Sequence, residues 1–544
     1  MKKLNDFISK NKIEFIILIL SFLFSYWLMF STFSYSGGFI QISSKAWSDF
    51  ASHIPLIRSF SLGYNFPPQY PLFSGPLIRY HFLFYLFAGL LEKTGLRIDY
   101  ALNIPSILGF VFLILMIYVF SKEIFKSKAI GILSILFFLF NGSLEFIKFL
   151  SSINFSKNIF LSIISSSKFV SFGPYDGSTV SAFWNLNIYT NQRHLALSYA
   201  LSLFIIYVFL HFDKKINFKN SLFLGLILGI LFYLNMAVFL MSIIVLSILL
   251  IFNFKQKKHV AFSILISLCI SMPFYFLMQS KESSFNLMFH AGYLVENFNF
   301  YNFFYYWFQN FGLHVFLILG SLLVLDKNRK RIFLSFFMLF VIGNLFQFSP
   351  EIAANHKFFN FFMIIGIMYS SYFIYYLWVK KLILRPIIPI LVFFLIFSGI
   401  LDFFPIYNDY KIQLPDYKIN KDIRWIVKNT KPNSIFLNTN YLYDNASIAG
   451  RKIFLGWPYF AWSQGYNTLK RDTLRKTLLT TNNLQFLCKT SSQYNIDYIE
   501  TSMYNPKDAN TVDVSILIKS NLKAVYRNNV TGYEIYSISQ NCKQ

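Results

Sequence analysis

The stretch that decides the fold is "IEFIILILSFLFSYWLMFSTF", residues 13–33, in which Glu14 is the only charged side chain. A helix that crosses a bilayer needs about 20 consecutive, mostly apolar residues, and this run supplies them. The run is longer than the apolar core of a secretory signal, and no small-residue cleavage site follows it. We therefore expect it to stay in the protein as a membrane anchor.

Apolar runs of this kind repeat along the chain up to about residue 405. Of the 544 residues, 55% are hydrophobic and 21% are aromatic, while only 13% are charged. Soluble domains carry about twice that charged share. The pattern predicts a polytopic α-helical membrane protein with roughly 11 to 13 spans. The apolar segments lie near 13–33, 101–120, 129–150, 195–211, 221–234, 237–253, 260–279, 312–325, 331–348, 358–378 and 386–404.

Basic residues gather in the short loops between these segments, as in "SKEIFKSK" and "DKNRKR". Such clusters mark the cytoplasmic side of a membrane protein. We therefore attribute the formal net charge of +25 to the orientation of the chain in a lipid bilayer, and we expect no nucleic-acid partner. We expect a protein of the cell (plasma) membrane with a cytoplasmic N-terminus. The external side then collects a first loop, residues 34–100, the loops 151–194, 280–311 and 349–357, and everything after about residue 405.

Near Tyr407 the composition changes to that of a soluble domain. "SIFLNT" and "IDYIET" have the pattern of strands, and "KAVYRNNVTGYEIYSI" has that of a hairpin turning around Asn528 to Gly532. Amphipathic helices are expected near 420–429 and 469–487. We therefore divide the chain into a transmembrane domain, residues 1–406, and an extracytoplasmic α/β domain, residues 407–544.

The three cysteines, Cys269, Cys488 and Cys542, lack the spacing of metal ligands. Cys488 and Cys542 can form a disulfide if the C-terminal part lies outside the cytoplasm.

The polar stretch "WSDFASHIPLIRSFSLGYNFPPQYPLFSGPLIRYHF", residues 47–82, follows the first span. Asp49 precedes His53 by four residues, so a helix would put both on one face. At a membrane interface, partial loss of water and a neighbouring imidazole can tune a carboxylate as a general base. The alternative is that Ser48 or Asp49 caps an interfacial helix.

Four further residues of this stretch form a candidate first-loop pocket: Arg58, Arg79, Tyr80 and His81. The prolines between them favour an extended path over a continuous helix. The alternative is a surface connector whose arginines meet lipid headgroups. The apolar segment Tyr80–Leu91 is too short to span, which favours an interfacial or re-entrant helix.

Two further clusters lie where external loops re-enter the membrane. We expect Arg193, His194, His356 and Lys357 to bind an anionic group such as a phosphate, because charged side chains at membrane depth are usually kept for a partner. Asn191 and Gln192 are candidates for contacting a sugar. Interfacial anchoring of Arg193, and a Lys357 pair with Glu351, are the alternatives.

The external segment "AGRKIFLGWPYFAWSQGY", residues 449–466, combines aromatic and polar side chains. Indole faces suit the apolar C–H faces of sugars, and hydrogen-bonding groups suit their rims. Arg451, Trp462 and Gln464 are therefore candidate acceptor or sugar contacts. The alternative is a loop in the core of the external domain.

The architecture resembles the GT-C superfamily of integral-membrane glycosyltransferases, which use polyprenyl-phosphate sugars. In that superfamily an essential acid follows the first span, and Asp49 matches that position. Residues 47–110 also look like the first loop of a poorly characterised group named for a Tyr-Tyr-Tyr motif, where this chain has Tyr80-His81-Phe82.

The resemblance implies a glycosyltransferase that moves a sugar from a polyprenyl-phosphate donor to a glycan, lipid or protein acceptor. Asp49 would be the base, with His53 as its partner or as a contact to the acceptor, and one displacement would invert the anomeric centre. We expect no cofactor, because no second acid lies near Asp49 in the first loop, although some members use a divalent metal. The alternatives are a lipid-linked glycan flippase or transporter, and a non-enzymatic cell-envelope assembly protein.

Overall fold

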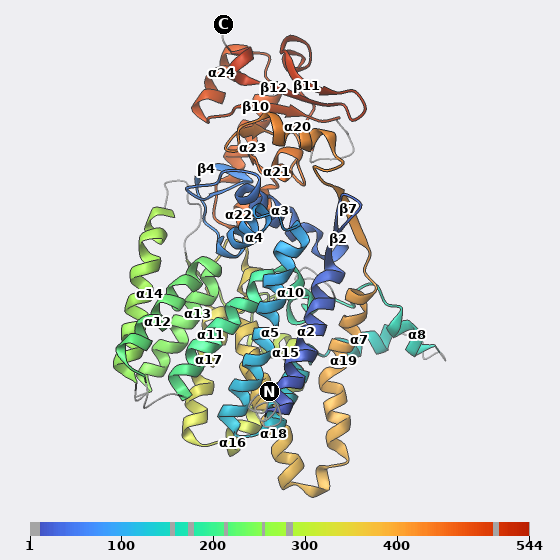
Figure 1. Ribbon diagram of the computed structural model, residues 1–544. Helices are drawn as coiled ribbons and strands as arrows, with labels where there is room; N and C mark the ends of the chain where they lie inside the picture. Colours follow the sequence, from blue (N-terminus) through green and yellow to red (C-terminus); the bar gives the residue numbers. More distant parts are fainter. Residues whose placement is uncertain are drawn as a thin grey trace, which may run out of the picture.

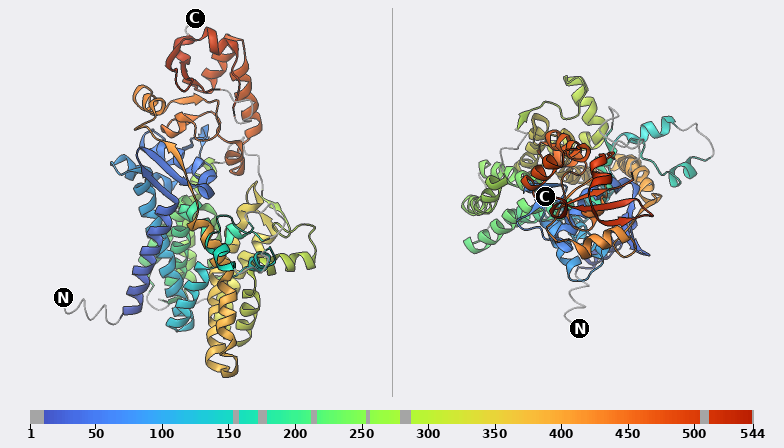
Figure 2. Two further views of the ribbon diagram at one scale, coloured as in Figure 1. Left: turned by 90° about the vertical axis from the view of Figure 1, so that its right-hand side faces the viewer. Right: turned by 90° about the horizontal axis from the view of Figure 1, so that it is seen from above.

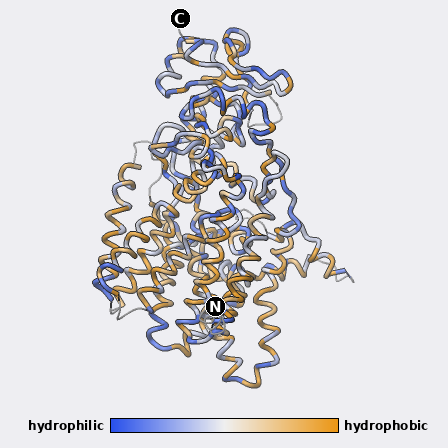
Figure 3. Tube along the Cα trace, viewed as in Figure 1, coloured by the Kyte–Doolittle hydropathy of each residue, from blue (hydrophilic) through white to orange (hydrophobic). Residues whose placement is uncertain are grey.

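The computed structural model describes residues 11–152, 158–171, 179–211, 216–252, 256–278, 287–503 and 511–542. A bundle of long helices forms one end of the molecule, and the C-terminal sheet with its helices stands on the other end (Figure 1). Figure 3 shows that the bundle is mostly hydrophobic along its length, whereas the C-terminal region is mixed. The chain is an integral membrane protein by this pattern.

Among the described residues, six helices are long and apolar enough to cross a bilayer: α2 (Lys12–Thr32), α5 (Ile98–Phe125), α11 (Arg193–His211), α14 (Lys257–Met278), α18 (His356–Lys380) together with the turn before it, and α19 (Ile387–Tyr407). A seventh span results if α15 (Phe300–Phe311) and α16 (His314–Val324), which meet at 93°, count as one.

The remaining apolar segments carry α6 (Lys128–Leu139), α12 (Phe218–Leu234), α13 (Met236–Ile251) and α17 (Lys327–Leu345). Every apolar segment of the sequence therefore contains a helix. By length and hydropathy the described residues hold six or seven spans, below the expected 11 to 13, because most of these other helices are shorter than a straight crossing requires.

The first loop is folded throughout. It forms β1 (Phe33–Ser36), β2 (Phe39–Ser43), η1 (Ser44–Ala46), α3 (Trp47–Ser61), β3 (Gln69–Tyr70), β4 (Phe73–Leu77) and α4 (Leu83–Lys93). Helices α3 and α4 pack so closely that a Cβ on Gly89 would lie 2.7 Å from the Ile57 carbonyl oxygen. The expected short helix at 80–91 is α4, with 11 residues.

Short elements connect the bundle. They are α7 (Glu145–Ser152), α8 (Ile159–Ile164), α9 (Ser181–Trp184), α10 (Asn187–Asn191), β5 (Met288–Phe289), β6 (Phe346–Gln347), η2 (Ile352–Asn355) and η3 (Leu382–Leu384). Helices α7 and α8 project sideways from the bundle, as the view from above also shows (Figure 2).

The chain after the last long helix is tied to the first loop by backbone pairing. Strand β7 (Lys411–Pro415) pairs antiparallel with β2, giving a sheet of order β1-β2-β7. The two ends of the membrane part are thus joined at the base of the C-terminal region.

A mixed five-stranded sheet of order β11-β12-β10-β8-β9 forms the C-terminal region. Its strands are β8 (Ile435–Leu437), β9 (Lys452–Ile453), β10 (Tyr498–Thr501), β11 (Ala524–Asn528) and β12 (Tyr533–Ser537). The strands and the hairpin expected from the sequence are confirmed. The helices are α20 (Lys421–Asn429), α21 (Asn445–Ile448), α22 (Pro458–Ser463), α23 (Thr468–Thr480), α24 (Leu484–Gln493), η4 (Leu517–Asn521) and α25 (Ile538–Asn541).

Two sequence expectations for this region can be checked directly. The single helix near 469–487 is wrong, because Asn483 caps a second helix by accepting a hydrogen bond from the Phe486 N–H at 2.9 Å. The Cys488–Cys542 disulfide is present and joins α24 to the C-terminal end of the fold.

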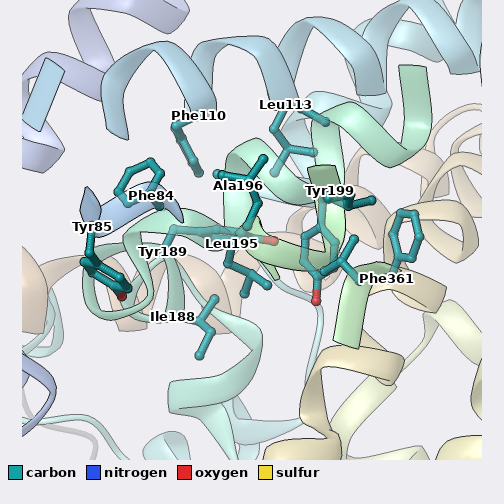
Figure 4. Packing of buried hydrophobic residues seen from close by; sticks show 14 of the residues in the cluster. Phe84, Tyr85, Phe110, Leu113, Ile188, Tyr189, Leu195, Ala196, Tyr199 and Phe361 are labelled. Atoms are coloured by element: carbon teal, nitrogen blue, oxygen red, sulfur yellow. The ribbon is translucent and has the colours of Figure 1, made fainter. Parts of the chain in front are cut away.

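The core beneath the first loop fixes the start of α11. Leu195 and Ala196 of α11 pack with Phe110 and Leu113 of α5 (Figure 4). The helices approach closely at Gly109, where an added Cβ would lie 2.8 Å from the Leu197 Cβ. This packing holds the polar residues at the start of α11 directly beside the first loop.

Candidate functional site

A cavity of about 920 Å³ lies where the helix bundle, the first loop and the C-terminal region meet. Polar side chains from all three parts line it, and α12, α13 and α14 add an apolar wall. Ten of the fifteen candidate residues line this one cavity: Asp49, His53, Arg79, Tyr80, His81, Asn191, Gln192, His356, Lys357 and Gln464.

Asp49 stands near the start of α3, and the helical spacing of four puts it on the same cavity wall as His53. Its half-buried carboxylate makes no hydrogen bond and no ion pair with any described residue. Burial raises the pKa of Asp49 to about 6, and the positive charge of Lys357 opposes that rise. The carboxylate can therefore accept a proton near neutral pH.

Lys357 is the second residue of α18 and lines the same cavity. Within the described ranges, its ammonium group also has no hydrogen-bond or ion-pair partner; neither Glu351 nor Asp49 lies within 4.0 Å of it. The N-terminal end of a helix carries the positive end of its dipole, which adds to the lysine charge. This corner of the cavity suits an anion.

His356, the first residue of α18, lies between two amides. The Gln192 Nε2 is 3.2 Å from its Nε2, and the Asn360 Nδ2 is 3.1 Å from its Nδ1. Its ring also stacks on Phe183 with centroids 4.5 Å apart. These contacts fix the imidazole in the cavity wall beside Lys357.

His53 is buried, and its ring stacks on that of Tyr85 with centroids 4.7 Å apart. Burial, together with the smaller effect of the Arg193 charge, lowers the pKa of His53 to about 3. The imidazole is therefore neutral at pH 7. Its Nδ1 has no hydrogen-bond partner in the part of the chain that the structure describes.

A chain of hydrogen bonds supports the cavity from behind. The Nε2 atoms of His81 and His194 are 2.7 Å apart, and the Nδ1 of His194 lies 2.9 Å from the Tyr85 hydroxyl. His194 itself does not line the cavity but orients His81, which does. Arg79 is fixed from above, since its Nη1 donates to the Gly465 carbonyl at 2.7 Å.

Three candidate arginines are buried away from the cavity. Arg58 forms ion pairs with Glu92 at 3.2 Å and with Asp416 at 2.9 Å. Arg193 donates to the Thr190 carbonyl and the Thr32 hydroxyl, both at 2.6 Å.

Arg451 donates to the Leu62 carbonyl at 2.8 Å and the Thr430 carbonyl at 3.0 Å. Like the other two arginines it joins distant segments. Trp462 is 38% exposed outside the cavity and packs on Tyr459, with ring centroids 5.9 Å apart.

The cavity also contains polar residues that were not among the candidates, notably Ser52, Glu351, Tyr459 and Ser463. The sequence analysis considered Glu351 as a partner for Lys357. Its carboxylate instead accepts a hydrogen bond from the Tyr459 hydroxyl at 3.0 Å. Tyr459 stands within the aromatic segment 449–466, which was the only sequence signal for it.

No group of three His, Cys, Asp or Glu side chains in the described part of the chain is close enough to hold a metal ion.

The fold and site define a polytopic membrane protein with a polar cavity between its helices and a C-terminal mixed sheet. Over nearly its full length the chain is similar to ArnT from Cupriavidus metallidurans in the apo state, with a TM-score of 0.46, 9% sequence identity, and 96% of this chain and 97% of that chain covered. It is also similar to that ArnT bound to undecaprenyl phosphate, with a TM-score of 0.37 and the same identity and coverage. No family model and no curated protein sequence matches the chain.

Proposed function

We propose that this protein is a membrane glycosyltransferase that moves a sugar from a polyprenyl-phosphate donor to an extracytoplasmic acceptor. The observation that carries the proposal is the presence of both the Asp49 carboxylate and the Lys357 ammonium in one cavity at the end of the helix bundle, each without a hydrogen-bond or ion-pair partner among the described residues. The resemblance of the first loop to GT-C transferases supports it.

In the proposed reaction, Asp49 takes the proton of an acceptor hydroxyl as its oxygen attacks the anomeric carbon of the donor sugar. The bond between that carbon and the phosphate oxygen breaks, and the polyprenyl phosphate leaves with the electron pair. One displacement inverts the anomeric centre. General-base help of this kind is worth typically 10²–10⁴-fold in rate. Neutral His53, four residues along α3, lies on the same wall and contacts the acceptor.

The leaving phosphate is placed at the start of α18. Lys357 and the helix dipole would stabilise its developing negative charge, and His356, held by Gln192 and Asn360, would form the wall beside it. No divalent metal is part of the proposal.

The lipid tail of the donor is assigned to the apolar wall of the cavity. Helices α12 to α14 supply this wall with Phe232, Met236, Phe239, Leu240, Met272 and Tyr275. Such side chains suit the hydrocarbon of a polyprenyl chain, since contact between the two removes apolar surface from water.

The other candidate residues take roles that follow from their places. Asn191, Gln192 and Gln464 line the cavity and are assigned to sugar contacts, with Arg79, Tyr80 and His81 as the first-loop side of the pocket. The buried Arg58, Arg193, His194 and Arg451, and Trp462 outside, act by holding these elements in place.

We also propose that the C-terminal region lies outside the cytoplasm, with residues 407–544 as an external domain. The Cys488–Cys542 disulfide supports this placement, because such bonds persist in oxidising compartments. The basic loops at the opposite end of the bundle support a cytoplasmic N-terminus. We also propose a topology of roughly 11 to 13 crossings, in which the shorter helices cross with local thinning of the bilayer.

The direct test is transfer of radiolabelled sugar from a panel of polyprenyl-phosphate sugars in membranes that express wild type or Asp49→Asn. The substitution keeps the shape of the side chain and removes the base. We expect transfer in wild type and its loss in Asp49→Asn at equal expression. A wild type that transfers nothing, yet moves lipid-linked glycans across vesicles, would favour a transporter instead.

A further inference from the structure

The cavity holds a second carboxylate, Glu351, whose surroundings differ from those of Asp49. Glu351 lines the cavity in the loop between β6 and α18. One of its oxygens accepts the Ala353 N–H at 3.1 Å, and the other accepts the Tyr459 hydroxyl at 3.0 Å. Asp49 has no such donors in the part of the chain that the structure describes, so one carboxylate is left to react and the other is held in place.

The loop that carries Glu351 is braced from two sides. Gln347 donates from its Nε2 to the carbonyls of Ser349 and Pro350, at 2.8 and 2.9 Å. The Ser349 hydroxyl donates to the Ser463 carbonyl of α22 at 2.8 Å. Together with the Tyr459 bond, these contacts attach the loop to the C-terminal region and fix the direction of the Glu351 carboxylate.

Glu351 retains hydrogen-bonding capacity that faces the cavity. A carboxylate has about four acceptor sites, and the structure fills two of those on Glu351. Close by in the chain from Ser463, Gln464 lines the same cavity, and its Oε1 is buried without a partner in the described residues. In the described residues the Gln464 Oε1 therefore lacks a donor, and each Glu351 oxygen can accept a second hydrogen bond. A ligand rich in hydroxyl groups would supply these donors.

We propose that Glu351 and Gln464 form a subsite for the hydroxyl groups of the transferred sugar, with Tyr459 as the positioning residue that aims Glu351. This subsite rests on the proposed transferase function. Glu351 lies six residues before Lys357, and both line the same cavity, so a sugar held by Glu351 stays next to the phosphate corner. The C-terminal region would thus complete the site and contribute to the choice of sugar.

The test compares wild type with Glu351→Gln, Tyr459→Phe and the double variant, with Glu296→Gln as the control because Glu296 is an exposed acid outside the cavity. Donor kcat and KM are measured for a polyprenyl-phosphate sugar and for its monodeoxy forms. We expect Glu351→Gln to lower kcat/KM about 10-fold or more, and Tyr459→Phe to lower it several-fold, at unchanged expression. The double variant should lose little beyond Glu351→Gln, since both act through one hydrogen bond.

The deoxy donors separate recognition from a general loss of structure. With the donor that lacks the recognised hydroxyl, wild type should already be slow, and Glu351→Gln should cost no further activity. An equal loss with every donor, or kinetics matching those of Glu296→Gln, would overturn the subsite while leaving the transferase intact. Absence of transfer by wild type from any donor would overturn the proposed function and this subsite together.

Discussion

The charged residues at the two ends of α3 have opposite surroundings. Asp49, near the start, faces the cavity without a partner in the described residues, whereas Arg58, near the end, is enclosed by the carboxylates of Glu92 and Asp416. In a mostly apolar protein, a charge whose partners are all internal holds the fold together. A charge left without a partner beside a cavity is available to a ligand or a reaction.

Neutralising Asp49 tests whether the charge that faces the cavity takes part in the reaction. We expect Asp49→Asn to lower kcat by about 10²–10⁴-fold, the usual contribution of a general base, with little change in stability. Sugar transfer and unfolding are measured on the same preparations. A variant that unfolds readily, or one that transfers at the wild-type rate, would contradict the assignment.

Neutralising Arg58 should have the opposite result. Arg58→Gln leaves Glu92 and Asp416 buried without a counter-charge, so we expect a loss of about 3–5 kcal/mol in the free energy of unfolding. Lys519→Gln is the control, because its ion pair with Asp513 is exposed and should contribute at most about 1 kcal/mol. Chemical unfolding in detergent measures both, and equal losses would refute a structural role for Arg58.

The disulfide extends the comparison to the C-terminal region. Replacing Cys488 and Cys542 together by serine opens a link between residues 54 positions apart. We expect the free energy of unfolding to fall by about 2–4 kcal/mol, with kcat preserved when the variant is folded. In the wild-type protein a thiol reagent should label one cysteine, Cys269, before reduction and three after it. Three reactive thiols before reduction in intact cells would argue against an external location.

Neutralising Lys357 tests whether this lysine binds the phosphate of the donor. Lys357→Met should raise the donor KM by about 10–100-fold, since the free energy of a hydrogen bond to a charged group corresponds to a change in affinity of this size. Lys380→Met, an exposed lysine at the other end of α18, serves as the control and should change nothing. Binding of a labelled polyprenyl phosphate measures the loss without turnover, and undiminished binding would remove Lys357 from the phosphate corner.

Local patterns in the sequence were sufficient for much of this molecule. The apolar runs gave the long helices, alternation gave β8, β10 and the β11–β12 hairpin, and the spacing of four placed Asp49 and His53 on one wall. Each of these depends on neighbours within a few residues. The charge alternation that assigns sides to the membrane remains a prediction.

Partners far apart in the chain could not be read from the sequence. Asp416 pairs with Arg58 across 358 residues, and Tyr459 reaches Glu351 across 108. The arginines that we expected to contact a ligand are therefore buried among internal partners. The place of Glu351 in the cavity wall was not recognised from the sequence. The break between α23 and α24 was missed for a local reason, because the capping role of Asn483 was not recognised.

The central claim, that the Asp49 carboxylate in the cavity is the reacting base, is tested most directly by the pH profile of sugar transfer. With a pKa of about 6, Asp49 must be ionised to accept a proton, so kcat/KM should fall about tenfold per pH unit below 6 and level off above it. We predict this acid limb in wild type and its absence from the residual activity of Asp49→Asn. The same limb in both proteins would assign the titration to another group and contradict the account.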